Sequence, residues 1–205
     1  MEIRSLVVGA FQENCYIVTD GDADGVVIDP GGDAERIIQA LGQGRISSIL
    51  LSHAHIDHIG AVAAVQKHTG ARIGLSDKET GLLKGAAVQA SLFGLPAPES
   101  FKIDFFLSDN LEIPLGRNRI TVLATPGHSP GGVSFLVSGR VFVGDALFYD
   151  SIGRTDLPGG SSDQLLRSIR DKLLSLADDT IVCPGHGRET TIGREKRQNP
   201  FLLHF

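Results

Sequence analysis

The string HAHIDH at residues 53–58 constrains this chain more than any other feature. It places three histidines and one aspartate within six residues, namely His53, His55, Asp57 and His58. The whole chain holds only 7 histidines in 205 residues, so chance clustering in a polar loop is the weaker interpretation. Nitrogen and oxygen ligands packed this closely suit zinc, iron or manganese. An apolar segment at 46–51 precedes the motif and has the pattern of a buried strand. The sequence therefore predicts a metal motif at the carboxyl end of a strand, where open α/β sheets bind ligands.

Three later strand ends carry residues of the same ligand chemistry. They are His128 in TPGHSPGG, Asp145 in GDALF and His186 in PGHG. Taken singly, an aspartate after a strand is more often a turn former. The inference comes from the set, because side chains at several strand ends are expected to meet at one edge of a sheet. His68 and His204 lie outside any such context and are expected to be surface or tail residues.

Composition indicates an ordinary globular protein, with 41% hydrophobic and 21% charged residues. Its length predicts one domain over 1–205, with a less regular insertion around 76–100. A formal charge of −5 with scattered Lys and Arg argues against a nucleic-acid partner. No apolar run approaches the ~20 residues that span a bilayer, and no secretory signal is expected. Two cysteines without a CxxC pair predict no structural disulfide and a cytoplasmic location; the oligomeric state stays open.

The order of the predicted elements indicates the architecture. Strands are expected at 2–8, 14–19, 25–28, 46–51, 72–75, 103–107, 110–113, 119–124, 133–137, 140–143 and 180–183, and helices at 34–41, 59–68 and 162–174. Asp33 is expected to cap the first helix. Strands with few helices, followed by more strands and a helix, predict two mixed β-sheets packed face to face with outer helices, an αββα sandwich.

Together the motifs resemble the metallo-β-lactamase superfamily over essentially the whole chain. HAHIDH, TPGHS, GDALF and PGHG follow one another as in that family, and NCYIV and VVIDPGG resemble its opening strands. The resemblance implies the metallo-β-lactamase fold and two divalent metal ions, with zinc favoured over iron or manganese. The ligands it implies are His53, His55 and His128 for the first ion, Asp57, His58 and His186 for the second, and Asp145 as the bridging carboxylate. Asp57 has a second candidate role, as the residue that orients the nucleophilic water.

Within the superfamily the chain is most similar to short bacterial glyoxalase II-like proteins, the hydroxyacylglutathione hydrolases. The segments SIGRTDLPGG at 151–160 and ETTIGREKRQNPFL at 189–202 carry this closer match. Asp145, in place of a cysteine, differs from the commonest zinc β-lactamases. The likeness implies a metal-dependent thioesterase that hydrolyses small glutathione-type thioesters, such as S-lactoylglutathione, with a hydroxide that bridges the two ions. Asp57 and Asp145 would then be the catalytic carboxylates.

Substrate recognition has weaker support in the sequence. Arg154 stands where full-length glyoxalase II enzymes carry a basic residue that contacts glutathione, which makes it a candidate substrate-binding residue. An ordinary surface role for Arg154 is an equally good interpretation. Asp156 stands where the family has a tyrosine, and the C-terminal helical domain of the full-length enzymes is not expected. These departures do not affect the prediction that the protein is a hydrolase, but they weaken the prediction that it recognises glutathione.

Two other functions fit the same motifs. One is a persulfide dioxygenase, an oxidoreductase with a single iron held by His53-, His128- and Asp145-type ligands, and GRTD followed by a hydrophobic residue also resembles that family. The other is a non-catalytic scaffold that kept the fold, which the seven filled ligand positions argue against. Two metal ions per chain would favour the hydrolase, and one iron the dioxygenase.

Overall fold

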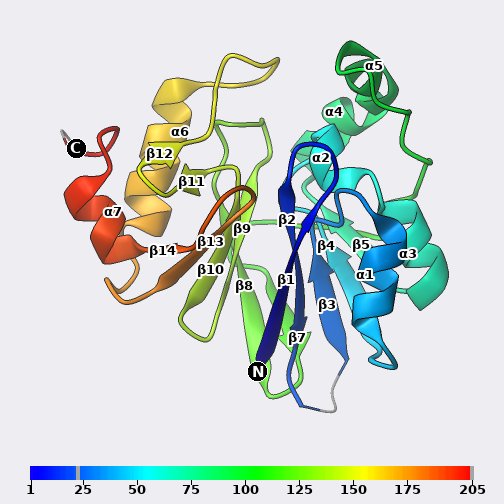
Figure 1. Cartoon of the computed structure of the whole chain (residues 1–205). Helices are drawn as coiled ribbons and strands as arrows, with labels where there is room; N and C mark the ends of the chain where they lie inside the picture. The colour runs from blue at the N-terminus through cyan, green and yellow to red at the C-terminus, as the bar shows by residue number, and fades with distance from the viewer. Residues whose placement is uncertain (22–23, 204–205) are drawn as a thin grey trace.

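Two six-stranded sheets pack face to face, and helices cover both outer faces (Figure 1). The computed structural model describes residues 1–21 and 24–203, so His204 lies outside the described residues. The predicted αββα sandwich of two mixed sheets is confirmed. In the described part of the chain, no helix combines the length and the apolar character needed to cross a membrane.

The first sheet is built entirely from the N-terminal half of the chain. Its strands lie side by side in sequence order: β1 (Glu2–Val8), β2 (Glu13–Thr19), β3 (Gly25–Ile28), β4 (Ile46–Leu50), β5 (Arg72–Leu75) and β6 (Phe105–Phe106). The pairs β1–β2 and β2–β3 are antiparallel, and the remaining pairs are parallel. Parallel neighbours need crossover connections, which are supplied by α1 (Ala34–Leu41) and by α2 (Ile56–Ile59) with α3 (Val62–Thr69).

The second sheet is built from the C-terminal half. Its spatial order is β14-β13-β10-β9-β8-β7, from the strands β7 (Glu112–Leu115), β8 (Asn118–Ala124), β9 (Val133–Val137), β10 (Arg140–Gly144), β13 (Ile181–Pro184) and β14 (Thr190–Thr191). Only the β10–β13 pair of this sheet is parallel among the described residues. Its crossover contains α6 (Ser162–Ser168), continued by a π-helical turn, η2 (Ile169–Leu173), and α7 (Ile192–Gln198) follows β14.

The segments between these strands hold three short helices and a small hairpin. Residues 76–100 contain the 3-10 turn η1 (Asp77–Glu79) and the helices α4 (Thr80–Lys84) and α5 (Ala86–Leu92), which project beyond one end of the sandwich (Figure 1). The strands β11 (Leu147–Phe148) and β12 (Ser151–Ile152) pair with each other.

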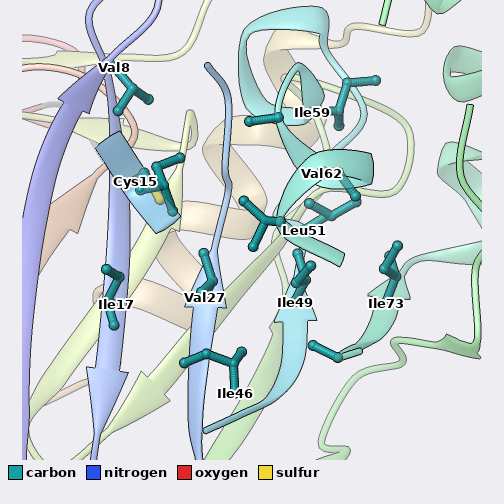
Figure 2. Packing of buried hydrophobic residues seen from close by; sticks show 14 of the residues in the cluster. Val8, Cys15, Ile17, Val27, Ile46, Ile49, Leu51, Ile59, Val62 and Ile73 are labelled. Carbon is teal, nitrogen blue, oxygen red and sulfur yellow. The ribbon is translucent and has the colours of Figure 1, made fainter. Parts of the chain in front are cut away.

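Three apolar clusters separate the four layers, because the strands bury both of their faces. Along β3 and β4, Val27 and Ile49 belong to the cluster that contains residues of the helices α1 and α3; Figure 2 shows both together with Val62 of α3. The alternate residues Val26 and Leu50 face the second sheet. A third cluster lies between the second sheet and α6, η2 and α7. Strands with two buried faces explain why these segments are continuous apolar runs.

Several predicted boundaries differ from the structure for local reasons. Asp33 is the N-cap residue of α1 as predicted, but its side chain makes no capping hydrogen bond: its backbone is left-handed (φ 48°), and its carboxylate accepts hydrogen bonds from the Gly9 N–H and Arg36 instead. The predicted helix 59–68 is two helices, because the backbone N–H of Ala61 donates to the carbonyl oxygen of Pro30. The strand predicted at 103–107 is shortened to Phe105–Phe106. The elements β11, β12, β14 and α7 were not predicted.

Candidate metal centre

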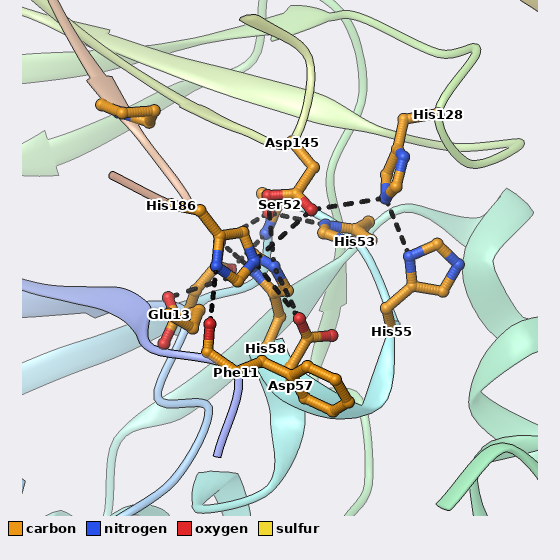
Figure 3. A network of polar contacts seen from close by, with 12 residues as sticks. Phe11, Glu13, Ser52, His53, His55, Asp57, His58, His128, Asp145 and His186 are labelled. Atoms are coloured by element: carbon orange, nitrogen blue, oxygen red, sulfur yellow. Dashed lines mark hydrogen bonds and ion pairs between the residues drawn. The ribbon is translucent and has the colours of Figure 1, made fainter. Parts of the chain in front are cut away.

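All seven predicted ligands lie at one end of the sandwich, just beyond the carboxyl ends of four strands (Figure 3). The strand β4 leads into the HAHIDH segment, and β8, β10 and β13 lead to His128, Asp145 and His186. The first sheet therefore contributes four of the side chains and the second sheet three. Asp57 and Asp145 have side chains that are 19% and 12% exposed, so the group is reachable from solvent.

The backbone of HAHIDH explains how six residues supply four ligands. Residues 52–55 are not helical, and α2 begins at Ile56. His53 and His55, two apart in extended backbone, can therefore point the same way. The single turn of α2 then brings Asp57 and His58 beside them. A Cβ at Gly31, in the DPGG turn, would lie 1.6 Å from the carbonyl oxygen of Asp57, so this close approach needs glycine.

The side chains form two clusters. In the first, ligand atoms of His53, His55 and His128 all lie within 4.8 Å of one another, and His55 Nδ1 is 2.9 Å from His128 Nε2. In the second, the same spacing holds for Asp57, His58 and His186, with His186 Nε2 3.3 Å from Asp57 Oδ2.

Asp145 lies between the two clusters. Its Oδ1 is 3.4 Å from His58 Nε2, and its Oδ2 is 3.6 Å from both His128 Nε2 and His186 Nε2. One carboxylate thus faces nitrogen atoms of both groups. This is the placement that a bridging ligand requires.

Hydrogen bonds fix which nitrogen of four histidines faces the clusters. The Nδ1 atoms contact Ser52 Oγ (2.9 Å), Asp29 (3.0 Å), the Arg154 carbonyl oxygen (2.8 Å) and the Phe11 carbonyl oxygen (3.1 Å), for His53, His58, His128 and His186 respectively. A carboxylate or carbonyl oxygen only accepts, so Nδ1 is the donor there and the lone pair remains on Nε2. This arrangement is typical of metal-ligating histidines.

Buried polar atoms without partners indicate that a cation fits here. Among the described residues, His53 Nε2, His58 Nε2 and Asp145 Oδ1 are buried and make no hydrogen bond. Such atoms are costly unless something binds them. Burial lowers the pKa of His55 to about 4, with His128 adding to the effect, and burial likewise lowers the pKa of His53. Neutral imidazoles are the form that binds metal ions.

In the second cluster, neighbouring opposite charges outweigh the effect of burial on the pKa values of the side chains. Burial alone would lower the pKa of His58, but the carboxylates of Asp145 and Asp57 outweigh it and raise that pKa. Burial alone would raise the pKa of Asp57, but His58 and His186 outweigh it and lower that pKa. At Asp145, burial is likewise outweighed by His58, which lowers the pKa of that carboxyl. Both carboxylates are therefore anions near neutral pH, as ligands must be.

Asp29 holds the ligands from behind and was missed as a site residue. The parallel pairing of β3 with β4 sets Ile28 opposite Leu50 and brings Asp29 beside Ser52. Its carboxylate accepts hydrogen bonds from the Ser52 N–H (2.7 Å), from Ser52 Oγ (2.5 Å) and from His58 Nδ1 (3.0 Å). The sequence signal is that Asp29 directly follows a buried strand, but the DPGG pattern by itself predicts only a turn.

Replacing Asp29 with asparagine is expected to raise the dissociation constant for bound metal about 10- to 100-fold, as for other groups that orient metal ligands. An asparagine has one acceptor oxygen and no charge, so it cannot replace the two carboxylate oxygens that accept hydrogen bonds from the Ser52 N–H and from His58 Nδ1. Competition with a chromophoric chelator measures the change. Asp33→Asn is the matched control, because Asp33 contacts Gly9 and Arg36 rather than a ligand. Equal metal affinity in both variants would contradict the assigned role.

A buried glutamate, Glu13, lies behind His58 and was also missed. Its Oε1 is 3.9 Å from His58 Nδ1, and neither carboxylate oxygen has a hydrogen-bond partner among the described residues. Burial raises the pKa of Glu13, which favours the neutral acid over an anionic ligand.

Arg154 lies beside the predicted ligands, but its charge is already paired. Its guanidinium donates two hydrogen bonds to Asp156, at 2.7 and 2.8 Å, while its carbonyl oxygen contacts His128 Nδ1. Both side chains are more than half exposed. The structure therefore places the Arg154 side chain at the rim of the site; its predicted contact with substrate stays a prediction.

A cleft of about 280 Å³ opens onto the clusters. Its floor holds Asp57, His128, Asp145 and His186, and its walls include Phe11, Phe93 and Leu157. The volume lies just below the roughly 300–1,000 Å³ that is usual for ligand sites, which suits a small substrate.

Known proteins share both the sequence and the fold. The chain is 42% identical to hydroxyacylglutathione hydrolase GloC of Haemophilus influenzae, over 98% of each chain. Crystal structures of BLEG-1 B3 metallo-beta-lactamase (TM-score 0.92, 42% identity, covering 98% of this chain and 99% of that one) and of TTHA1623 in a di-iron-bound form (TM-score 0.88, 39% identity, 97% and 100%) are similar throughout.

The family model agrees with these relatives. The model of the metallo-beta-lactamase superfamily matches residues 8–186, a range that contains all seven predicted ligands. Together with the His/Asp clusters, this match supports divalent metal binding. The chain therefore belongs to the metallo-beta-lactamase superfamily.

Proposed function

We propose that this protein is a metal-dependent hydrolase of glutathione-type thioesters, with S-lactoylglutathione-like compounds as the leading substrates. The observation that carries the proposal is the pair of His/Asp clusters joined by Asp145 at the floor of an open cleft. The 42% identity to hydroxyacylglutathione hydrolase GloC supports a thioester as substrate. As a second candidate, the equal identity to BLEG-1 B3 metallo-beta-lactamase favours a β-lactam substrate.

Seven residues would hold two divalent ions, with zinc the first choice. His53, His55 and His128 would bind one ion, Asp57, His58 and His186 the other, and Asp145 both. When bound, such ions polarise a carbonyl oxygen and lower the pKa of water toward neutrality. The di-iron form of TTHA1623 keeps iron as an alternative.

The protein's own groups position the reactants. Asp57 faces the cleft as an anion, so it can also accept a hydrogen bond from a water molecule and aim it at the substrate carbonyl. Asp145 and Asp57 concentrate negative charge on the cleft floor, which the metal charge must balance before an anionic transition state can form there. The leaving group is a thiolate, whose conjugate acid has a pKa of about 8.5, so its departure requires little help from an acid.

The cellular setting is part of the proposal. Both cysteines, Cys15 and Cys183, are buried and unpaired, which supports a reducing compartment such as the cytoplasm. We propose a small-molecule substrate and neither a nucleic-acid nor a membrane partner.

Metal-loaded protein is expected to release free thiol from S-lactoylglutathione, and removal of the metal with a chelator is expected to abolish the release. The reason is that Asp57 and Asp145 place negative charge beside the reacting carbonyl, which disfavours an anionic transition state unless metal charge balances it. A thiol-reactive dye measures the product, and elemental analysis of the same preparation counts the ions. Restoring zinc, iron or manganese separately is the control that identifies the active metal.

The alternatives give different results in the same preparation. Opening of a chromogenic cephalosporin without thioester turnover favours the β-lactam reaction. Oxygen uptake with glutathione persulfide and one iron per chain favours the dioxygenase. Fully metallated protein that releases no thiol would overturn the thioesterase proposal.

A further inference from the structure

Two phenylalanines form an apolar wall on one side of the cleft. Phe11 comes from the turn between β1 and β2, and Phe93 directly follows α5. Their rings meet edge to face, with centroids 5.3 Å apart, and both line the cleft beside Asp57 and His186. Phe11 is 39% exposed and Phe93 44% exposed. Figure 3 shows the Phe11 ring next to Asp57.

The wall is anchored to the candidate ligands from both segments. The carbonyl oxygen of Phe11 contacts His186 Nδ1 at 3.1 Å. On the other segment, the side chain of Gln89 in α5 accepts a hydrogen bond from the backbone N–H of Ile56, inside HAHIDH, at 2.7 Å. The backbone segments that carry the two rings are therefore tied to the candidate ligands, as the support of a specificity pocket must be.

The cleft offers no unpaired side-chain ammonium or guanidinium among its described lining residues. Arg154 is the one lysine or arginine among the described residues that line it, and its guanidinium donates two hydrogen bonds to the carboxylate of Asp156. Ile56 and Leu157 extend the apolar surface around the two rings. An anionic group pressed against this wall would lose its hydration without gaining a partner.

These observations indicate which half of a thioester the apolar wall binds. A glutathione-type thiol carries carboxylates and an ammonium group, which are best left in solvent. The acyl chain is the uncharged half, and burying its methylenes against phenyl rings is favourable. We propose that Phe11 and Phe93 bind the acyl chain, that within this class of thioesters apolar acyl chains longer than lactoyl bind more tightly, and that Phe93 is a specificity-determining residue. This inference rests on the proposed thioesterase function.

Binding of thioethers tests the wall without requiring turnover. S-hexylglutathione and S-methylglutathione carry an apolar chain of different length in place of the acyl group and cannot be hydrolysed. Titration calorimetry on the metal-loaded protein is expected to show at least about tenfold tighter binding of the hexyl compound. Phe93→Ala is expected to reduce that ratio to about twofold or less, and Phe93→Leu to keep most of it.

Leu92→Ala is the matched control. Leu92 is the neighbouring residue, is 80% exposed and is not among the cleft-lining residues, so its removal is expected to leave the ratio unchanged. Both positions are solvent-exposed, and thermal unfolding verifies that each variant is folded.

Three results would overturn the inference: no detectable binding of S-hexylglutathione, a ratio near one in the unaltered protein, or the same ratio in Phe93→Ala. Turnover of thioesters distinguishes failure of the wall from failure of the proposed function. If neither S-lactoylglutathione nor S-hexanoylglutathione releases thiol while the binding ratio still depends on Phe93, the thioesterase proposal fails and the apolar wall stands. If both are hydrolysed with a ratio of kcat/KM that Phe93→Ala leaves unchanged, the wall fails and the thioesterase stands.

Discussion

Replacing Asp145 with asparagine is expected to lower kcat/KM for thioester hydrolysis by about a thousandfold, the order seen when a key stabiliser of developing charge is removed. We also expect the bound metal to fall from two ions per chain to one or fewer. The two oxygens of Asp145 face different clusters, 3.4 Å from His58 Nε2 and 3.6 Å from His128 Nε2. An asparagine keeps the shape but loses the charge, and its NH2 group cannot ligate a cation. Elemental analysis and the thiol assay measure the two effects.

Asp156→Asn is the control for this variant, because Asp156 lies at the rim with a side chain that is 69% exposed. It is expected to retain both ions. In chelator, Asp145→Asn is expected to unfold at a lower temperature than the unaltered protein, because Asp145 pairs with His58, whose pKa it raises, and removing one partner of a buried pair is destabilising. Retention of two ions, with activity within tenfold of the unaltered protein, would show that Asp145 does not bridge.

Replacing Glu79 with alanine is expected to lower the free energy of unfolding by about 2–6 kcal/mol, from about 1–3 kcal/mol for each of the two buried donors left unpaired. Glu79 is fully buried. Its carboxylate accepts from the backbone N–H of Ala54 at 2.9 Å and from that of Gly131 at 2.6 Å. The loop of Ala54 carries His53 and His55, and the loop of Gly131 carries His128. The carboxylate of Glu79 therefore links the two loops that supply the first cluster. Chemical denaturation with and without chelator measures the loss.

The same variant is expected to weaken metal binding about 10- to 100-fold, the usual cost of losing a group that orients ligands. Glu79→Gln, which keeps one acceptor oxygen, is expected to lie between the alanine variant and the unaltered protein. Glu99→Ala, at an exposed position of the same insertion, controls for loss of charge. A loss of stability below about 1 kcal/mol, the net value of a single ordinary hydrogen bond, would contradict the joining role.

The convergence of the candidate ligands was predictable because it depends on short-range rules. Four of them come from six residues whose extended and helical backbone is evident in the sequence. His128, Asp145 and His186 each follow a strand, and parallel strands end at a common edge. The geometry brings all seven together as predicted. Their role in binding metal stays a prediction that elemental analysis tests.

The supporting residues were not predictable in the same way. Glu79 lies 25 positions from Ala54 and 52 from Gly131, within a segment whose sequence shows no periodicity. The approach of Phe11 to Phe93 depends likewise on how a turn of the first sheet meets the end of α5. Such contacts are set by tertiary packing, which local propensity does not contain. The two-residue strands β11, β12 and β14 are too short to give an alternating pattern.

Each sheet is completed by one continuous half of the chain, and this has a consequence for synthesis. Once residue 106 has left the ribosome, every strand of the first sheet has been made, and the nascent chain already carries His53, His55, Asp57 and His58. The second sheet and its three ligands come later, with His186 last. The candidate metal centre is therefore complete only after the two halves, made one after the other, have packed together. An ion bound by residues of both halves would then hold them in place.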